Sequence, residues 1–272
     1  VPALLNAKAP LSFAKDGLST HSHEGDPVVA ALKTNLPAAF TLKAISSSLP
    51  AISRPSPVKP LYLPAKTTPY RFTMSSYFPI PPLPRDNPLI EERIALGEKL
   101  FHDTALSRDG TLSCASCHLT ENAFTDPRRF SIGVEGRTGT RNGMPLFNLA
   151  WKSSFFWDGR APSLREQSLK PIQDHLEMDE TLENVVAKLE KTSKAEFARA
   201  FDSDAITPER IGLALECFLL TITSFDSKFD RSMRGEATLT DEEKRGFELF
   251  MTEYEPRMGQ KGADCFHCHG GP

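Results

Sequence analysis

The 272-residue sequence has no apolar run long enough to cross a membrane and no strong excess of charge of one sign. Its longest apolar stretches, such as residues 28–32, fall far short of the roughly 18 residues that a membrane-spanning helix needs. The formal net charge is only −3, with 32 Lys and Arg against 35 Asp and Glu. We therefore predict no transmembrane segment and no nucleic-acid partner, because nucleic-acid binders carry a basic field.

The sequence also shows neither an initiating Met nor a recognisable signal-peptide pattern. The sequence begins with Val, and no charged n-region followed by an apolar h-region is visible. We expect that any signal peptide has already been removed. The sequence stops three residues after a Cys-Phe-His-Cys-His motif, and we therefore expect a fragment of a longer protein.

Proline is scarce except near the start, where 15 of the 22 prolines lie in residues 1–88. Residues 1–75 carry 8 Lys and Arg against 3 Asp and Glu, a net charge of +5, whereas the rest carries 24 against 32, or −8. Repeated Pro blocks helices and central strands. We predict a disordered or linker segment, rich in Pro and Ser, over residues 1–77. A tail that binds anionic surfaces and a stretch foreign to the mature protein stay open as alternatives.

Helical periodicity dominates the chain after Phe78. Asn87-Pro88 predicts the start of a helix over about 88–102, with an inward face of Ile90, Ile94, Gly97 and Phe101. Further helices are predicted near 180–191, 194–201, 208–225 and 240–251, two of them beginning at Thr207-Pro208 and at the capping box Thr240–Glu243. Nothing longer than three or four residues alternates like a strand. The predicted fold class is mostly α, with long loops.

A short pattern occurs twice in the chain. Counted from the Gly, Gly97–Phe101 (GEKLF) precedes Cys114 by 17 residues, and Gly246–Phe250 (GFELF) precedes Cys265 by 19. In each copy a helix carries a Gly where another backbone could approach closely, and a loop then leads to the same five-residue motif. Such a repeat predicts tandem homologous domains. The Cys-x-x-Cys-His motif that ends each copy predicts that these domains are cytochrome c-like. We place the first domain at 78–235 and the start of the second, which is incomplete, at 236–272.

The repeated motif is Cys-x-x-Cys-His, the attachment pattern of c-type haem. Two thiols three residues apart can form thioethers with the two vinyl groups of one porphyrin, and the adjacent His then lies under the iron as its proximal ligand. The sequence therefore predicts two covalently bound haem c groups. Their ligands are Cys114, Cys117 and His118 in the first motif, and Cys265, Cys268 and His269 in the second.

Zinc binding and thiol redox chemistry are the alternatives for these cysteines. Paired zinc knuckles normally lie tens of residues apart, whereas 147 positions separate His118 from Cys265. A thioredoxin-like redox pair would need a βαβ context, which the sequence lacks. The fifth cysteine, Cys217, lies on the apolar side of a predicted helix, so we predict a buried small residue and not a third site.

Further motifs point to a particular class of haem protein. In chain order they are Phe124-Thr125-Asp126, Ser131-Ile132-Gly133, Gly139–Asn142 (GTRN), Phe155–Ala161 (FFWDGRA), Leu164–Gln167 (LREQ), Lys170-Pro171-Ile172 and Glu177-Met178. In this order, around two haem motifs, they closely resemble the bacterial di-haem cytochrome c peroxidase family, which includes the MauG-type enzymes. The resemblance covers about residues 78–272.

This resemblance implies a peroxidatic haem in the first domain and an electron-transfer haem in the second. It places Trp157 on the electron path between the haems, with a large core aromatic as the alternative. Glu177 matches the acid of the distal pocket, which moves a proton on bound peroxide; an ordinary surface Glu is the alternative. Gln167 and Pro171 match pocket-lining positions. Asn142 matches a ligand of a calcium ion between the domains, although no acidic calcium loop is visible.

Val134 departs from the pattern of many family members. They carry a His after the Ser-x-Gly, as a removable sixth ligand that closes the peroxidatic iron in the oxidised enzyme. Valine cannot ligate iron, so the resemblance implies an open first haem that needs no reductive activation, as in the MauG-like branch. His175 could reach the pocket instead, although we favour a solvated or structural role for it.

The predicted function is that of a periplasmic di-haem peroxidase, an oxidoreductase of the cytochrome c peroxidase type. It would reduce hydrogen peroxide to water with electrons from a small redox protein, a cytochrome c or a cupredoxin. Haem is attached covalently outside the cytoplasm, and the four motif cysteines serve haem and not disulfides. A MauG-like oxidase of a protein side chain and a non-enzymatic electron carrier are the alternatives. The oligomeric state, monomer or homodimer, stays open.

Overall fold

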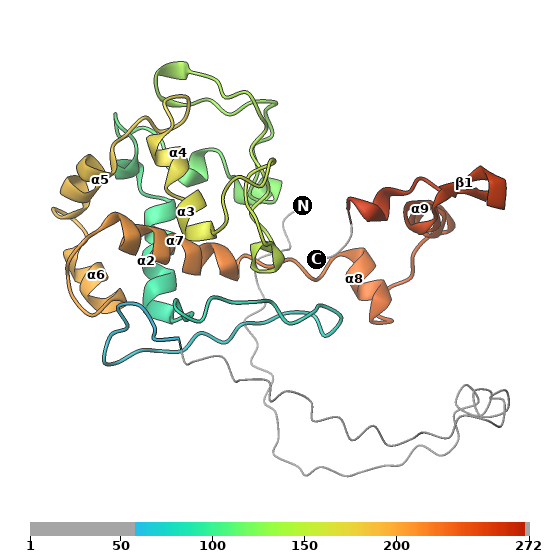
Figure 1. Cartoon of the computed structure of the whole chain (residues 1–272), viewed down its shortest axis with the longest axis horizontal. Helices are drawn as coiled ribbons and strands as arrows, with labels where there is room; N and C mark the ends of the chain where they lie inside the picture. The colour runs from blue at the N-terminus through green and yellow to red at the C-terminus, as the bar shows by residue number, and fades with distance from the viewer. Residues whose placement is uncertain (1–57, 270–272) are drawn as a thin grey trace, which may run out of the picture. The chain divides into compact units, whose positions relative to one another are not determined.

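The computed structural model describes residues 58–269, and Figure 1 shows the helices that make up most of their regular structure. The predictions for residues 1–57 lie outside the described residues. The helices are α2 (Glu91–Phe101), α3 (Leu164–Gln167), α4 (Lys170–Gln173), α5 (Leu182–Leu189), α6 (Lys194–Ala200), α7 (Pro208–Thr221), α8 (Lys228–Met233) and α9 (Asp241–Met251). Strands β1 (Tyr254–Glu255) and β2 (Gln260–Lys261) pair antiparallel. The mostly α class is confirmed, and among residues 58–269 no helix is long and apolar enough to span a membrane.

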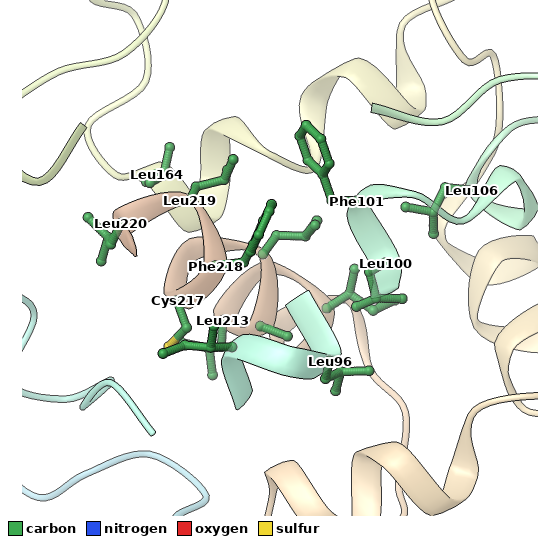
Figure 2. Close-up of a cluster of buried hydrophobic side chains, with 14 of the residues drawn as sticks. Leu96, Leu100, Phe101, Leu106, Leu164, Leu213, Cys217, Phe218, Leu219 and Leu220 are labelled. Carbon is green, nitrogen blue, oxygen red and sulfur yellow. The ribbon is translucent and has the colours of Figure 1, made fainter. Parts of the chain in front are cut away.

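The core forms where α2 packs against α7 (Figures 1 and 2). Helix α7 is buried nearly all round, including Cys217 at 0% exposure, as predicted. Phe101 of α2 and Phe218 of α7 bring their ring centroids to 5.2 Å, at the centre of the buried cluster. The face of α2 predicted to point inward is buried. This helix pair is the frame from which the loops of the site extend.

Gly97 is the point of closest approach between these two helices. A methyl group at Gly97 would lie 2.0 Å from the carbonyl oxygen of Ala214, so only glycine fits. We expect Gly97→Ala to lower the free energy of unfolding by about 3 kcal/mol, because an overpacked core must shift backbone. Gly246→Ala on α9 is the matched control, since no described atom lies within 4 Å of its added methyl group. Denaturant unfolding of both holoproteins measures the difference, and equal stabilities would contradict it.

The predicted helix starts are confirmed at α7 and α9 but wrong at α2. The Thr207 hydroxyl accepts the Arg210 amide, and Thr240 forms the capping box with Glu243. Helix α2 instead begins at Glu91, after Ile90. The Asn87 side chain does not cap it: Asn87 accepts a hydrogen bond from Arg93 at 2.5 Å and donates one to Glu216 at 2.7 Å. A buried polar network spanning 129 positions therefore takes the side chain that local pattern assigns to a cap.

Residues 58–77 pack against the helical core, although the sequence placed the start of folded structure near Phe78. Leu61, Tyr62, Tyr70 and Phe72 rest on the core. The buried Arg93 guanidinium of α2 donates to the carbonyls of Leu61 and Tyr62, at 3.1 and 3.2 Å. Single side chains and backbone carbonyls anchor this extended segment to the core, so its apolar residues need not recur with a helical or strand period. A search of the sequence for such periods therefore misses it.

The C-terminal part of the described chain contains α8 and α9. Lys228 pairs with Glu243 at 2.6 Å, and the rings of Phe229 and Phe247 lie 5.1 Å apart. The backbone of Ala263 donates to Leu249 of α9, which ties the loop before the second Cys-x-x-Cys-His motif to that helix.

Candidate functional site

The first Cys-x-x-Cys-His motif folds into a single 3₁₀ turn, Cys114–Ser116. Both the Cys117 and His118 amides donate to the Cys114 carbonyl, at 3.2 and 3.0 Å. Ser113 and Ser116 cap this turn with reciprocal hydrogen bonds. The turn brings the two half-buried thiols and the imidazole together at one end of a loop, as attachment to one porphyrin requires.

His118 is held in the orientation of a metal ligand. Its Nδ1 lies 2.8 Å from the carbonyl oxygen of Phe124, which can only accept, so in the neutral ring Nδ1 carries the proton and Nε2 keeps the lone pair that can ligate a metal. Ala123 and Phe124 are both left-handed, with φ of 56°, and this costly backbone aims the carbonyl at the ring. Burial lowers the pKa of His118, which favours the neutral form that ligates iron. The donor set therefore fits a covalent haem c.

Glu177 lies beside this motif, on a turn formed by residues 174–180. Burial raises the pKa of Glu177 to about 7, the nearby Asp174 adds to the rise, and Arg160 opposes it. The Glu177 charge in turn contributes to the raised pKa of both Cys114 and Cys117, so the carboxyl group lies near the two thiols. A carboxyl group that titrates near neutral pH is suited to proton transfer.

Val134 and His175 both lie near this turn, but Val134 is buried and His175 is exposed. Val134 is 1% exposed, and its amide donates to the Glu177 carbonyl at 2.8 Å. The His175 side chain is 73% exposed, with Nδ1 3.7 Å from the Asp174 carboxylate. The solvated role that we favoured for His175 agrees with this placement.

Trp157 is not a core aromatic, so that alternative is wrong. Its side chain is 58% exposed, and its indole nitrogen donates to the Asn142 carbonyl at 2.9 Å. Beside it, the Arg160 guanidinium lies 3.6 Å from the Phe156 ring centroid. The segment therefore holds a large indole at the surface of the described chain by specific contacts.

The other matched positions surround the same region. Asn142 donates from its side-chain amide to the Arg128 carbonyl at 2.8 Å, so this group already has a protein partner, and calcium binding stays a prediction. Gln167 is half-buried at the end of α3. Pro171 in α4 accepts the Met178 amide at 3.2 Å, which connects that helix to the Glu177 turn.

Asp126 has a part in the site that sequence reasoning missed. It is 3% exposed, and Arg128 donates to both of its oxygens, at 2.8 and 2.7 Å. Hydrogen bonds from Arg128 lower the pKa of Asp126 to about 2, and Ser131 contributes to that decrease. The Phe-Thr-Asp motif contained the signal, but only the fold shows that this buried charge organises the loop beside Cys117.

The second motif has the same local fold in a more open setting. Residues Cys265–His267 form a 3₁₀ turn, and the Cys268 and His269 amides donate to the Cys265 carbonyl at 3.2 and 2.9 Å. Cys268 and His269 are exposed in the described chain. His267 lies 2.7 Å from the Asp264 carboxylate through Nδ1, so the additional histidine of this motif has a partner within the loop.

Comparison with known proteins places this chain among di-haem proteins. The profile of the family described as di-haem cytochrome c peroxidase matches residues 91–238. The methylamine utilization protein MauG of Methylophilus methylotrophus is 36% identical over 191 residues, which are 69% of this chain and 55% of that protein. The cytochrome c peroxidase Ccp of Escherichia coli K12 is 36% identical over 197 residues, 71% of this chain and 40% of that protein.

Solved structures give the same result. A MauG-like protein associated with microbial copper homeostasis matches with a TM-score of 0.66 and 36% identity, over 74% of this chain and 58% of that one. The di-haem peroxidase BthA of Burkholderia thailandensis matches with a TM-score of 0.54 and 29% identity, over 59% of this chain and 46% of that one. The chain thus spans about half the length of the proteins that it matches.

Proposed function

Because this chain belongs to the di-haem cytochrome c peroxidase family, which includes the MauG proteins, we propose that it is part of a di-haem peroxidase. The enzyme would reduce hydrogen peroxide to two molecules of water with two electrons and two protons. The observation that carries the proposal is Glu177, a half-buried acid whose pKa is raised to about 7, close to the first Cys-x-x-Cys-His motif.

Bound haem c would supply the iron centre that receives peroxide and exchanges electrons. Cys114 and Cys117 would hold it as thioethers, and His118 would ligate it through Nε2 while Nδ1 stays on the Phe124 carbonyl. The ionised Glu177 carboxylate would accept a proton from one peroxide oxygen and return it to the oxygen that leaves as water. Gln167 would line the same pocket.

The second motif would bind the electron-transfer haem in a second cytochrome c-like domain that begins at about residue 236. Trp157 would carry electrons between the two sites, and its exposed, hydrogen-bonded indole supports a role at a surface between domains. A small periplasmic redox protein, a cytochrome c or a cupredoxin, would donate the electrons. Calcium at Asn142 belongs to the same proposal, as does a periplasmic location.

A MauG-like oxidase is the second candidate, and Val134 favours it. A buried valine beside Glu177 cannot close the iron as a histidine would. Such an enzyme would use the same oxidising site to modify a protein side chain. Product analysis with a candidate protein substrate distinguishes the two activities.

Low-temperature EPR of the oxidised holoprotein, with and without cyanide, tests the proposal. We expect a high-spin ferric signal that cyanide converts to low spin, because no histidine follows the Ser-x-Gly and His175 is exposed. Cys117→Ala and Cys268→Ala assign the signal, which should be lost only when the first motif is altered. Two low-spin haems indifferent to cyanide would support the electron-carrier alternative instead.

A further inference from the structure

The Glu177 carboxyl group depends on its backbone for its position. Burial and the charges of Asp174 and Arg160 act on it, but among the described residues no hydrogen bond to its carboxyl group does so. Its amide donates to the Asp174 carbonyl at 3.0 Å within the turn. Without a side-chain partner, the place of the carboxyl group follows the 174–180 turn, and anything that fixes that turn fixes the acid.

One loop, residues 131–138, packs directly on this turn. A methyl group at Gly133 would lie 2.1 Å from the Leu176 carbonyl oxygen, so the two backbones touch where only glycine fits. One residue later, the Val134 amide donates to the Glu177 carbonyl. The loop therefore contacts the peptide groups on both sides of the Glu177 Cα atom.

Arg137 closes this contact from the other side. Its Nη1 donates to the His175 carbonyl and to the Asp179 carboxylate, both at 2.8 Å. These partners lie two residues before and two residues after Glu177. Its Nη2 donates to Glu135 at 2.5 Å, within the loop itself. One guanidinium group thus joins the loop to both ends of the segment that carries the acid.

Arg108 reinforces the same cluster. It pairs with Glu135 at 2.5 Å and with Asp179 at 2.8 Å, and its amide donates to the Met178 carbonyl at 3.0 Å. Glu135 and Asp179 are both left-handed, with φ of 60° and 51°. Non-glycine residues adopt this conformation at a cost in free energy. The ion pairs of the two arginines with Glu135 and Asp179 therefore help to hold these residues in it.

The opposite end of the loop reaches the haem-attachment motif. The Ser131 side chain lies close to both the Cys117 thiol and the buried Asp126 carboxylate, and it acts to lower the pKa of each group. Ser131 and Arg137 are six residues apart, and the loop is closed between them by the Gly133 amide, which donates to the Arg137 carbonyl at 2.7 Å. A single closed loop therefore links Cys117 to Glu177.

We propose that Arg137 is a positioning residue for Glu177: through the His175 carbonyl and Asp179 it fixes the acid relative to the first Cys-x-x-Cys-His motif. The inference rests on the proposed proton-transfer role of Glu177. If Arg137 were purely structural, it would stabilise the loop without changing the rate of the reaction with peroxide. The test must therefore separate these two roles.

Arg137→Gln and Arg137→Lys are compared in the holoprotein with Arg234→Gln. Arg234 is a close match, because its guanidinium also bonds two carboxylates and one carbonyl: Asp226, Glu236 and Phe225. We expect Arg137→Gln to slow the reaction with peroxide about tenfold to a hundredfold, since small displacements of a reacting group cost that much. Lysine should restore part of the rate, because it retains the charge but not the fork of donors. Arg234→Gln should leave the rate unchanged.

The double variant Arg137→Gln/Glu177→Gln shows whether Arg137 acts through the acid. If it does, Arg137→Gln slows the Glu177→Gln protein by less than about twofold, because the two effects are not additive. Hydrogen exchange of the Val134 amide, which bonds the Glu177 carbonyl, should become faster in Arg137→Gln and stay unchanged in Arg234→Gln.

Each failure has its own result. If Arg137→Gln slows the Glu177→Gln protein as much as it slows the native protein, the positioning role is overturned. Unchanged hydrogen exchange at the Val134 amide in Arg137→Gln overturns it as well. If Glu177→Gln alone leaves the rate unchanged, the proposed function of the acid fails first, and Arg137 has no reaction to serve. Melting temperatures of all variants identify any that is simply unfolded.

Discussion

Glu177→Gln is expected to slow the reaction of the oxidised holoprotein with hydrogen peroxide about 10²- to 10⁴-fold, the usual contribution of a positioned general base. Glutamine has nearly the same shape but cannot accept the peroxide proton. Haem content and the spin state of the first haem should stay the same, because Glu177 is not a ligand in the proposed site. Stopped-flow absorbance at rising peroxide concentrations gives the second-order rate constant.

The pH dependence gives a second, independent signature of the same residue. Burial raises the pKa of Glu177 to about 7, so the carboxyl group is protonated and inactive as a base below that pH. The rate of the native protein should therefore rise with pH through about 7 and level off above it, whereas the Gln variant should lack this step. Glu183→Gln, an exposed acid in the first turn of α5, is the matched control. A native rate that is flat across this range would contradict the assignment of Glu177.

The helices could be predicted from sequence because their signals are local. Thr207 and Thr240 cap α7 and α9 through hydrogen bonds to amides three residues away, and a reader of the sequence sees both partners at once. Asn87 carries the same local signal, but Arg93 and Glu216 take its side chain. No local pattern can indicate a partner 129 positions away, so the prediction failed there.

The site divides in the same way. The ligand residues of the haem motifs lie within five positions, and their spacing alone indicates the chemistry. The hydrogen bond between His118 and the Phe124 carbonyl depends on two consecutive residues with left-handed backbone, Ala123 and Phe124. Nothing in the side chains of these two residues indicates that conformation. The contact of Gly133 with the Leu176–Glu177 backbone joins segments some 40 positions apart, and only the fold reveals it. Sequence thus predicted the residues of the haem motifs and the proposed acid, while the fold shows what holds them.

Val134→His should close the first site. Residue 134 is buried and its amide bonds the Glu177 carbonyl, so a histidine introduced there would lie beside the proposed peroxide pocket. In many of the di-haem peroxidases that the sequence resembles, this is expected to be the position of a removable sixth ligand. We expect EPR to show a low-spin first haem in the oxidised variant. If the imidazole occupies the iron in about 99% of molecules, the apparent rate with peroxide falls about 100-fold, because only the open fraction reacts.

Ile132→His is the matched control for this closure. It introduces the same side chain into the same loop two residues earlier, where the native side chain is 40% exposed, and it should leave the high-spin signal and the peroxide rate intact. Partial reduction should then restore reactivity in Val134→His alone, because a removable sixth ligand of this kind is expected to close the iron only in the oxidised enzyme. A high-spin, fully reactive Val134→His protein would show that residue 134 does not face the iron. An open native site, where EPR shows one, would then require an explanation other than the valine.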